Sequence, residues 1–248
     1  MKNHLTNLKD YLLHLNNLHK FLGFGIFFKT ARETNSKLTL LKRPPAGNVL
    51  VLSPHPDDDI FGCGGTLRLH HDQNDEINIL YLSGNESRIA EAQTALEIIG
   101  INKFENLDMI DGKITDSQAV IDKITQRITD LKPKTIYAPC FVDPNSDHLA
   151  TSKILAKALE KTNFDGEIFM YEIWSPIYAN RLISIDKTIE TKIKAMQAHQ
   201  SQLKDRPYVD AFIGLSQYRA NMFDHGKNAE AFFACDKETY IKTSKLFG

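Results

Sequence analysis

Short apolar runs alternate along most of the chain with longer segments in which apolar residues recur every three or four positions. The short runs predict buried strands, and the longer segments predict amphipathic helices. The predicted strands cover residues 48–53, 77–82, 104–110, 135–138 and 167–174. The predicted helices cover residues 60–71, 86–99, 119–131, 149–161 and 188–203.

Alternating strands and helices predict an α/β fold, a Rossmann-like three-layer sandwich with helices on both faces of a mostly parallel central sheet. With the five strands numbered along the chain, we expect a strand order of about 3-2-1-4-5. Ligands of such sheets bind beyond the carboxyl ends of the strands. The residues that follow each strand are therefore the first candidates for a functional site.

The two ends of the chain depart from this pattern. Leucines spaced by three and four positions predict an amphipathic helix near the N-terminus, and these are Leu5, Leu8, Leu12, Leu15 and Leu22. We expect residues 1–46 to form a helical extension packed on a single domain of residues 47–248. The extension also allows contact with a membrane surface or a second copy of the chain. No element is predicted for the mixed tail from Arg206 to Gly248.

Composition and charge exclude several classes of protein. Lys and Arg total 30 and Asp and Glu total 31, so the net charge of −1 does not favour a nucleic-acid partner. The three cysteines, Cys63, Cys140 and Cys235, are far apart and form neither a disulfide framework nor a cysteine zinc motif. The longest apolar stretch, residues 21–28, is too short to cross a bilayer. We expect a cytoplasmic protein with no transmembrane segment, which can be peripheral to the inner face of the membrane.

The loop after the first predicted strand reads Ser53-Pro-His-Pro-Asp-Asp-Asp59. Three adjacent carboxylates repel one another unless a cation lies among them. His55 and Asp58 are three positions apart and can bind one divalent ion, which leaves Asp57 or Asp59 free as a general base. Zinc suits these ligands, and iron, manganese and cobalt do so less selectively. Helix capping would explain one aspartate but not His55 between two prolines.

A second loop, Pro139 to His148, follows the fourth strand and ends in Asp147-His148. If the first and fourth strands are neighbours, both loops lie at the same edge of the sheet. His55, Asp58 and His148 would then form a metal site that keeps positions open for water. Asp147 could orient an imidazole from behind. Taken alone, His148 would read as a surface histidine at a helix start.

The Pro-His-Pro-Asp-Asp motif and the later Asp-His-Leu-Ala resemble the PIG-L/LmbE-like family of zinc-dependent N-acetylglucosamine de-N-acetylases. The resemblance extends from about residue 48 to residue 203. It implies that His55, Asp58 and His148 are the zinc ligands and that Asp57 is the general base.

The same resemblance implies contacts with the substrate. Arg88 matches the family arginine that tends to contact the sugar, and Asp111 matches an aspartate on the substrate side. The segment from Lys194 to Gln202 resembles a family helix and assigns His199 to the substrate.

One residue departs from the family motif. Asn145 stands where the family usually has a histidine that assists the oxyanion or the leaving amine. An asparagine amide donates a hydrogen bond to an oxyanion but transfers no proton. Either Asp57 makes both proton transfers or another acid helps, with His199 the candidate by resemblance and Asp143 by proximity.

The resemblance implies hydrolysis of the N-acetyl group of an N-acetylglucosamine-type sugar or glycoconjugate, small or lipid-linked, with release of acetate. Three alternatives remain: a metal-dependent amidase acting on a non-sugar amide, a metal-free nucleotide-binding enzyme, and a non-catalytic sugar-binding protein. Homo-oligomers are compatible with each of them. We expect Trp174 and Tyr178 to lie in the core rather than to stack on a sugar.

Overall fold

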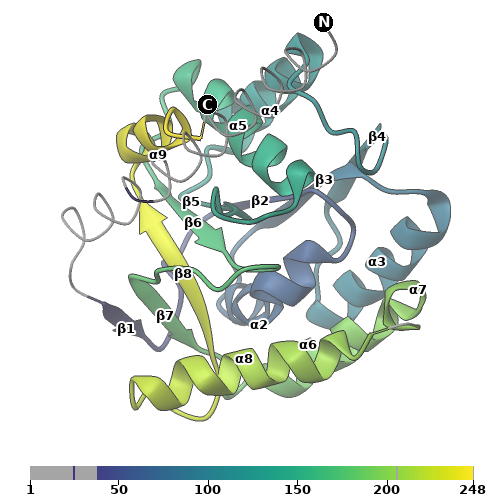
Figure 1. Cartoon of the computed structure of the whole chain (residues 1–248), viewed down its shortest axis with the longest axis vertical. Helices are drawn as coiled ribbons and strands as arrows, with labels where there is room; N and C mark the ends of the chain where they lie inside the picture. Colours follow the sequence, from purple (N-terminus) through teal and green to yellow (C-terminus); the bar gives the residue numbers. More distant parts are fainter. Residues whose placement is uncertain (1–24, 26–37, 205, 248) are drawn as a thin grey trace, which may run out of the picture.

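The computed structural model describes residue 25, residues 38–204 and residues 206–247 (Figure 1). Within these residues, one sheet of eight strands has the order β1-β7-β8-β6-β5-β2-β3-β4. The strands are β1 (Thr39–Leu41), β2 (Val49–Ser53), β3 (Ile77–Ser83), β4 (Phe104–Met109), β5 (Thr135–Pro139), β6 (Glu167–Tyr171), β7 (Arg181–Ser184) and β8 (Ala229–Cys235). The predicted N-terminal leucine helix lies outside the described residues.

The five predicted strands are β2 to β6, and they lie side by side in the predicted order. All four pairings among them are parallel, and Val51 of β2 pairs with both Ile79 of β3 and Tyr137 of β5. The α/β fold and the arrangement of the first and fourth predicted strands are therefore confirmed. The carboxyl ends of β2 and β5 meet at one edge of the sheet.

The other three strands extend the sheet beyond β6. Strand β8 pairs antiparallel with both β6 and β7, and β1 pairs parallel with β7. Residues 39–41, which we had expected in the helical extension, are thus an edge strand. Strand β8 was not predicted because Ala229, Glu230 and Ala231 have low strand propensity and carry no alternating pattern.

Helices cover both faces of the sheet (Figure 1). They are α2 (Asp58–Asp72), α3 (Glu86–Ile99), α4 (Gln118–Leu131), α5 (Ser146–Glu160), α6 (Ile189–Ala198), α7 (Gln200–Leu203), α8 (Tyr208–Met222) and α9 (Lys237–Ser244). One core packs α4, α5 and α9 against the sheet, and the other packs α2, α3 and α6. The predicted helix over 188–203 is broken at His199 into α6 and α7. None of the described helices has the length and hydrophobicity needed to cross a bilayer.

Helix α2 directly follows β2 and lies unusually close to the sheet. A Cβ atom on Gly62 would come within 2.5 Å of the Tyr171 ring, so only glycine permits this approach. The helix is kinked at Cys63, so the first backbone N–H groups of its second half lack acceptors within the helix. Gly65 and Thr66 donate these N–H groups to the Glu230 carboxylate of β8, which also binds Lys192. Strand β8 therefore caps the helix that carries the first loop.

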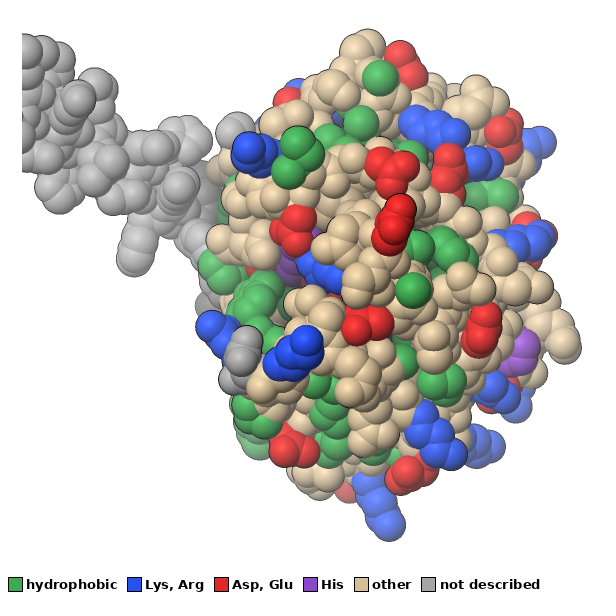
Figure 2. All heavy atoms as spheres, turned by 90° about the vertical axis from the view of Figure 1, so that its right-hand side faces the viewer, with side chains coloured by type: hydrophobic (Ala, Val, Ile, Leu, Met, Phe, Trp, Pro, Cys, Tyr) green, Lys and Arg blue, Asp and Glu red, His purple; other side chains and the backbone are tan. Residues whose placement is uncertain are grey.

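The surface carries both signs of charge. On the face shown in Figure 2, blue and red side chains are interspersed and do not gather into a large area of one sign. This distribution matches the near-zero net charge of the whole chain. It gives no electrostatic signature of a polyanion-binding surface on that face.

Candidate metal-dependent active site

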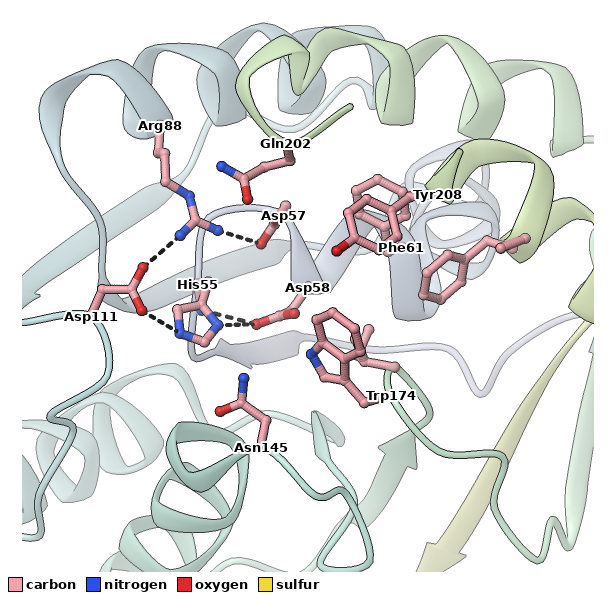
Figure 3. Close-up of a pocket in the computed structure, with 13 residues that line it drawn as sticks. His55, Asp57, Asp58, Phe61, Arg88, Asp111, Asn145, Trp174, Gln202 and Tyr208 are labelled. Carbon is pink, nitrogen blue, oxygen red and sulfur yellow. Dashed lines mark hydrogen bonds and ion pairs between the residues drawn. The ribbon is translucent and has the colours of Figure 1, made fainter. Parts of the chain in front are cut away.

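A cavity of about 400 Å³ opens at the edge where β2 and β5 end (Figure 3). Its walls come from the loop before α2, from the first turn of α2, from α3, from the loops after β4, β5 and β6, and from α7 and α8. The lining residues are His55, Asp57, Asp58, Phe61, Arg88, Asp111, Asn145, Ile173, Trp174, Gln202, Tyr208, Ala211 and Phe212.

The structure brings His55 and Asp58, which line this cavity, together with the fully buried His148. One carboxylate oxygen of Asp58, Oδ2, lies 3.0 Å from His55 Nδ1 and 3.2 Å from His148 Nε2. Each residue offers one ligand atom, these atoms lie within 4.8 Å of one another, and all three residues are buried. Asp58 and His148 are both in the first turn of a helix, α2 and α5 respectively. The neighbouring parallel strands thus bring two imidazoles and one carboxylate together from distant parts of the sequence.

Carboxylates also back the other nitrogen of each imidazole. His148 Nδ1 lies 3.1 Å from Asp143 Oδ2. His55 Nε2 lies 3.2 Å from Asp147 Oδ2 and from Asp111 Oδ1. Such a carboxylate fixes the tautomer and the ring orientation of a metal-binding histidine. Asp147 therefore faces His55, whereas Asp143 faces the adjacent His148.

The donor set fits a divalent cation. Both nitrogens of His148 are buried without an aligned hydrogen bond, although carboxylate oxygens lie only 3.1 and 3.2 Å away. Buried polar atoms are rarely left in this state. Burial lowers the pKa of His148, but Asp58 and Asp143 outweigh it and raise this pKa to about 10. The site thus attracts positive charge, and two imidazoles with one carboxylate suit zinc and leave coordination positions open.

Asp57 lines the cavity next to these groups. Its Oδ1 accepts a hydrogen bond from Arg88 Nη2 at 3.0 Å, and Arg88 Nη1 donates to Asp111 Oδ2 at 2.8 Å (Figure 3). Burial and the charge of Asp58 raise the pKa of Asp57 to about 6, although Arg88 lowers it. Such a value suits a general base near neutral pH.

The other base candidate, Asp59, points away from the cavity. It is fully buried and accepts a hydrogen bond from the Tyr81 hydroxyl at 2.9 Å. Burial raises its pKa to about 7, although the Tyr81 hydrogen bond opposes this. Of the two candidate bases, Asp57 lines the cavity and Asp59 does not.

Asn145 is the N-cap of α5. Its Oδ1 accepts the backbone N–H of Asp147 at 2.8 Å, while its own backbone N–H donates to Asp143 Oδ1. Because Oδ1 is engaged in capping, the amide NH2 group is left for the cavity, and Figure 3 shows it directed toward His55.

Three predicted site residues are buried and are not among those that line the cavity: Asp147, His148 and His199. Asp147 is buried and accepts backbone N–H groups from Gly112 at 2.7 Å and Ile114 at 3.2 Å, which ties down the loop carrying Asp111. His199 is 1% exposed at the break between α6 and α7, with its ring centroid 6.0 Å from that of Phe61. Its Nε2 has no hydrogen-bond partner among the described residues. Gln202, three positions later, lines the cavity instead.

The expectation that Trp174 and Tyr178 lie in the core is wrong. Trp174 is 47% exposed and Tyr178 is 38% exposed. Strand β6 ends at Tyr171, so Trp174 lies in the following loop, where its backbone N–H donates to Asp143 Oδ2 at 3.0 Å. Tyr208 and Phe212 were missed because α8 was not predicted. A tryptophan just beyond the carboxyl end of a parallel strand was the one available signal.

Comparison with known proteins agrees with this geometry. Residues 50–159 match the family model described as PIG-L, GlcNAc-PI de-N-acetylase. The diacetylchitobiose deacetylase of Thermococcus kodakarensis is 24% identical over 224 residues, which cover 75% of this chain and 82% of that protein. A probable N-acetyl-alpha-D-glucosaminyl L-malate deacetylase of Bacillus cereus is 26% identical over 62% of this chain and 83% of its own length.

A solved structure has the same fold. The crystal structure of a conserved protein from Thermus thermophilus superimposes with a TM-score of 0.67 and 29% identity, covering 74% of this chain and 92% of that one. The family match includes both loops that supply the His55, Asp58 and His148 cluster. The resemblance drawn from the two loop motifs is therefore confirmed: residues 50–159 match the model of the PIG-L family.

Proposed function

We propose that the protein is a metal-dependent hydrolase that removes the N-acetyl group from an amino sugar of the N-acetylglucosamine type and releases acetate. The observation that carries this proposal is the cluster of His55, Asp58 and His148, whose ligand atoms lie within 4.8 Å of one another, with His55, Asp58 and Asp57 lining one cavity. Both relatives reported above are named as deacetylases of N-acetylated sugars, which supports the same reaction here.

His55, Asp58 and His148 would hold the cation, and we propose zinc. A divalent cation supplies a polarised water and a positive charge near the amide oxygen. Asp143 and Asp147 keep the two imidazoles oriented through their other nitrogens.

Asp57 is the proposed base. Its carboxylate takes a proton from the attacking water, and Arg88 holds the carboxylate by a hydrogen bond of 3.0 Å. Asp57 then carries the proton that the leaving nitrogen needs. The two rival acids are less suited, because both oxygens of Asp143 already accept backbone N–H groups and His199 does not line the cavity.

Asn145 is the proposed donor to the amide oxygen as negative charge develops on it. Its amide is held in one orientation by the capping bond to Asp147. A donor fixed before the reaction stabilises developing charge without reorganisation. The departure from the family histidine would therefore retain oxyanion stabilisation and lose an acid.

Arg88, Asp111 and Gln202 are the proposed sugar contacts. They form the polar side of the cavity, and Asp111 is more than half exposed. Charged and amide groups of this kind recognise sugar hydroxyls by hydrogen bonds.

We propose that the protein works in the cytoplasm. All three cysteines are buried and unpaired, which supports the reducing cytoplasm that we expected.

The test is acetate release by zinc-loaded protein from a panel of N-acetylhexosamines, with Asp57→Asn as the inactive control. Release that is lost in Asp57→Asn and after chelation supports the proposal. Sugar binding without release would indicate the non-catalytic alternative. Release only from non-sugar amides would indicate the amidase.

A further inference from the structure

We propose that the apolar half of the cavity binds the acyl group of the substrate and accepts N-acyl groups longer than acetyl. This inference rests on the proposed hydrolase function and extends it to the class of acyl group removed. The observation behind it is an aromatic wall that an acetyl methyl group would leave largely empty.

The cavity has two chemically different halves, which meet at the His55 and Asp58 cluster. Arg88, Asp111 and Gln202 lie on one side of the cluster in Figure 3, and aromatic residues lie on the other. The apolar half consists of Phe61, Ile173, Trp174, Tyr208, Ala211 and Phe212. In Figure 2, green side chains likewise gather beside a recessed purple histidine.

The apolar wall is already assembled without a ligand. The rings of Phe61 and Phe212 are 5.0 Å apart, and Trp174 contacts Tyr208 edge to face at 5.9 Å. The guanidinium of Arg206 lies 5.8 Å from the Trp174 ring centroid. These contacts hold the side chains in place, so little conformational entropy remains to be lost on binding.

The wall is also held at a fixed distance from the proposed metal site. The backbone N–H of Trp174 donates to Asp143, the same carboxylate that faces His148. A buried pair between Glu172 and Arg219 holds the other side of this loop, and Glu172 also accepts the Ile177 N–H. The alkyl chain attached to the reacting carbonyl would therefore always contact the same apolar wall.

The substrate amide joins a sugar, on its nitrogen, to an acyl group, and the polar half of the cavity suits the sugar. Hydroxyl groups of a sugar suit Arg88, Asp111 and Gln202, so the acyl group is left to face the aromatic side. An acetyl group ends in one methyl, whereas Trp174 is 47% exposed and the cavity measures about 400 Å³. Exposed aromatic surface facing a cavity gains free energy when an apolar group covers it.

The expected gain is measurable. Each methylene buried against such a wall should raise kcat/KM about fourfold until the apolar half is filled. We therefore expect N-butanoylglucosamine and N-hexanoylglucosamine to be hydrolysed more efficiently than N-acetylglucosamine. Trp174→Ala should reduce the ratio of hexanoyl to acetyl hydrolysis about tenfold, whereas Tyr218→Ala, at an exposed aromatic outside the cavity, should leave it unchanged.

The competing occupant of the apolar half is an apolar aglycone. The hexyl glycoside of N-acetylglucosamine carries a similar alkyl chain on the sugar instead of the amide, so it serves as the matched substrate. A gain for this glycoside with no gain for N-hexanoylglucosamine would overturn the assignment to the acyl group. A kcat/KM that falls with each methylene added to the acyl group of N-acylglucosamine would overturn it as well.

Binding can be followed without catalysis because the chain has one tryptophan, and it is Trp174. Titrating Asp57→Asn with N-hexanoylglucosamine should change the Trp174 emission at lower concentration than titrating with N-acetylglucosamine. If no N-acyl sugar is hydrolysed by the parent protein but this order of binding holds, the proposed function fails, while the assignment of the apolar half to the acyl group stands. Equal or inverted binding overturns the inference itself.

Discussion

Asp143 Oδ2 lies 3.1 Å from Nδ1 of His148, on the side of the imidazole opposite the Asp58 carboxylate. The same oxygen accepts the backbone N–H of Trp174, and its partner oxygen accepts that of Asn145. One buried carboxylate thus positions a proposed metal ligand, the apolar wall and the capping residue. Both of its oxygens face nitrogen atoms, so an amide NH2 group at either position would face another nitrogen.

We expect Asp143→Asn to weaken metal binding by about 10- to 100-fold, because an asparagine NH2 would face either a ring nitrogen or a backbone N–H. Competition with a chromophoric chelator measures the affinity directly. Asp165→Asn, at an exposed surface pair with Lys134, is the matched control. An unchanged affinity in the folded Asp143→Asn protein would remove the positioning role.

The pH profile tests the pairing of Asp57 with Arg88. A base must be deprotonated, so activity should fall as the pH drops through the pKa of Asp57, which is about 6. A nearby cation favours the carboxylate, so the acidic limb of kcat/KM in the metal-loaded enzyme should lie at or below pH 6.

Arg88→Gln removes a charge that lowers the pKa of Asp57, so the acidic limb should move to higher pH. The kcat/KM at neutral pH should fall by about 10- to 100-fold, as for the loss of a hydrogen bond to a charged group. Arg68→Gln, on the far part of α2, is the matched control. A reduced rate with an unmoved limb would mean that Arg88 binds substrate without tuning Asp57.

Asn145→Asp separates the capping role from the donor role. Aspartate still caps α5, so the melting temperature should change little. It offers an acceptor where the amide offered a donor, so kcat should fall by about 100- to 1000-fold. Asn145→Ala should lose both, with a lower melting temperature as well. Full activity in Asn145→Asp would show that the amide does not donate to the reacting oxygen.

His199 should make the fold less stable in acid. Burial lowers the pKa of His199 from 6.5 to about 4, with smaller contributions from the charges of Glu91, Arg88 and Asp58. The folded state therefore keeps this imidazole neutral while the unfolded chain takes up a proton. The stability that neutral His199 contributes is fully present above about pH 6.5 and is lost as the pH falls toward 4.

Melting temperatures at pH 7.5 and pH 5, in one metal state, measure this contribution. The difference between them should be smaller in His199→Gln than in the parent protein. His71→Gln, at a partly exposed position near the end of α2, should keep the parent difference. An equal difference in all three proteins would assign the acid sensitivity to other groups.

Patterns within one element were sufficient for much of the fold. Apolar runs predicted β2 to β6, and the alternation of strands and helices predicted an order in which β2 and β5 are neighbours, as they are. The cluster of His55, Asp58 and His148 followed from the same argument.

Features that depend on distant contacts could not be predicted in this way. Strand β8 is rich in alanine, and its state is decided by pairing on both sides with β6 and β7. Trp174 resembled a core residue because nothing local reveals that β6 stops three positions before it. The role of Asp143 depends on a loop 31 residues later, where Trp174 donates its N–H.

The position of β8 has a consequence for the order of events on the ribosome. Strand β1 touches the sheet through β7 alone, and β7 joins the rest through β8, which is made last of the eight. Strand β1 must therefore wait until about residue 235 has emerged before it can join the sheet. Five parallel strands with the histidine loops can form earlier, but the second half of α2 stays uncapped until Glu230 arrives.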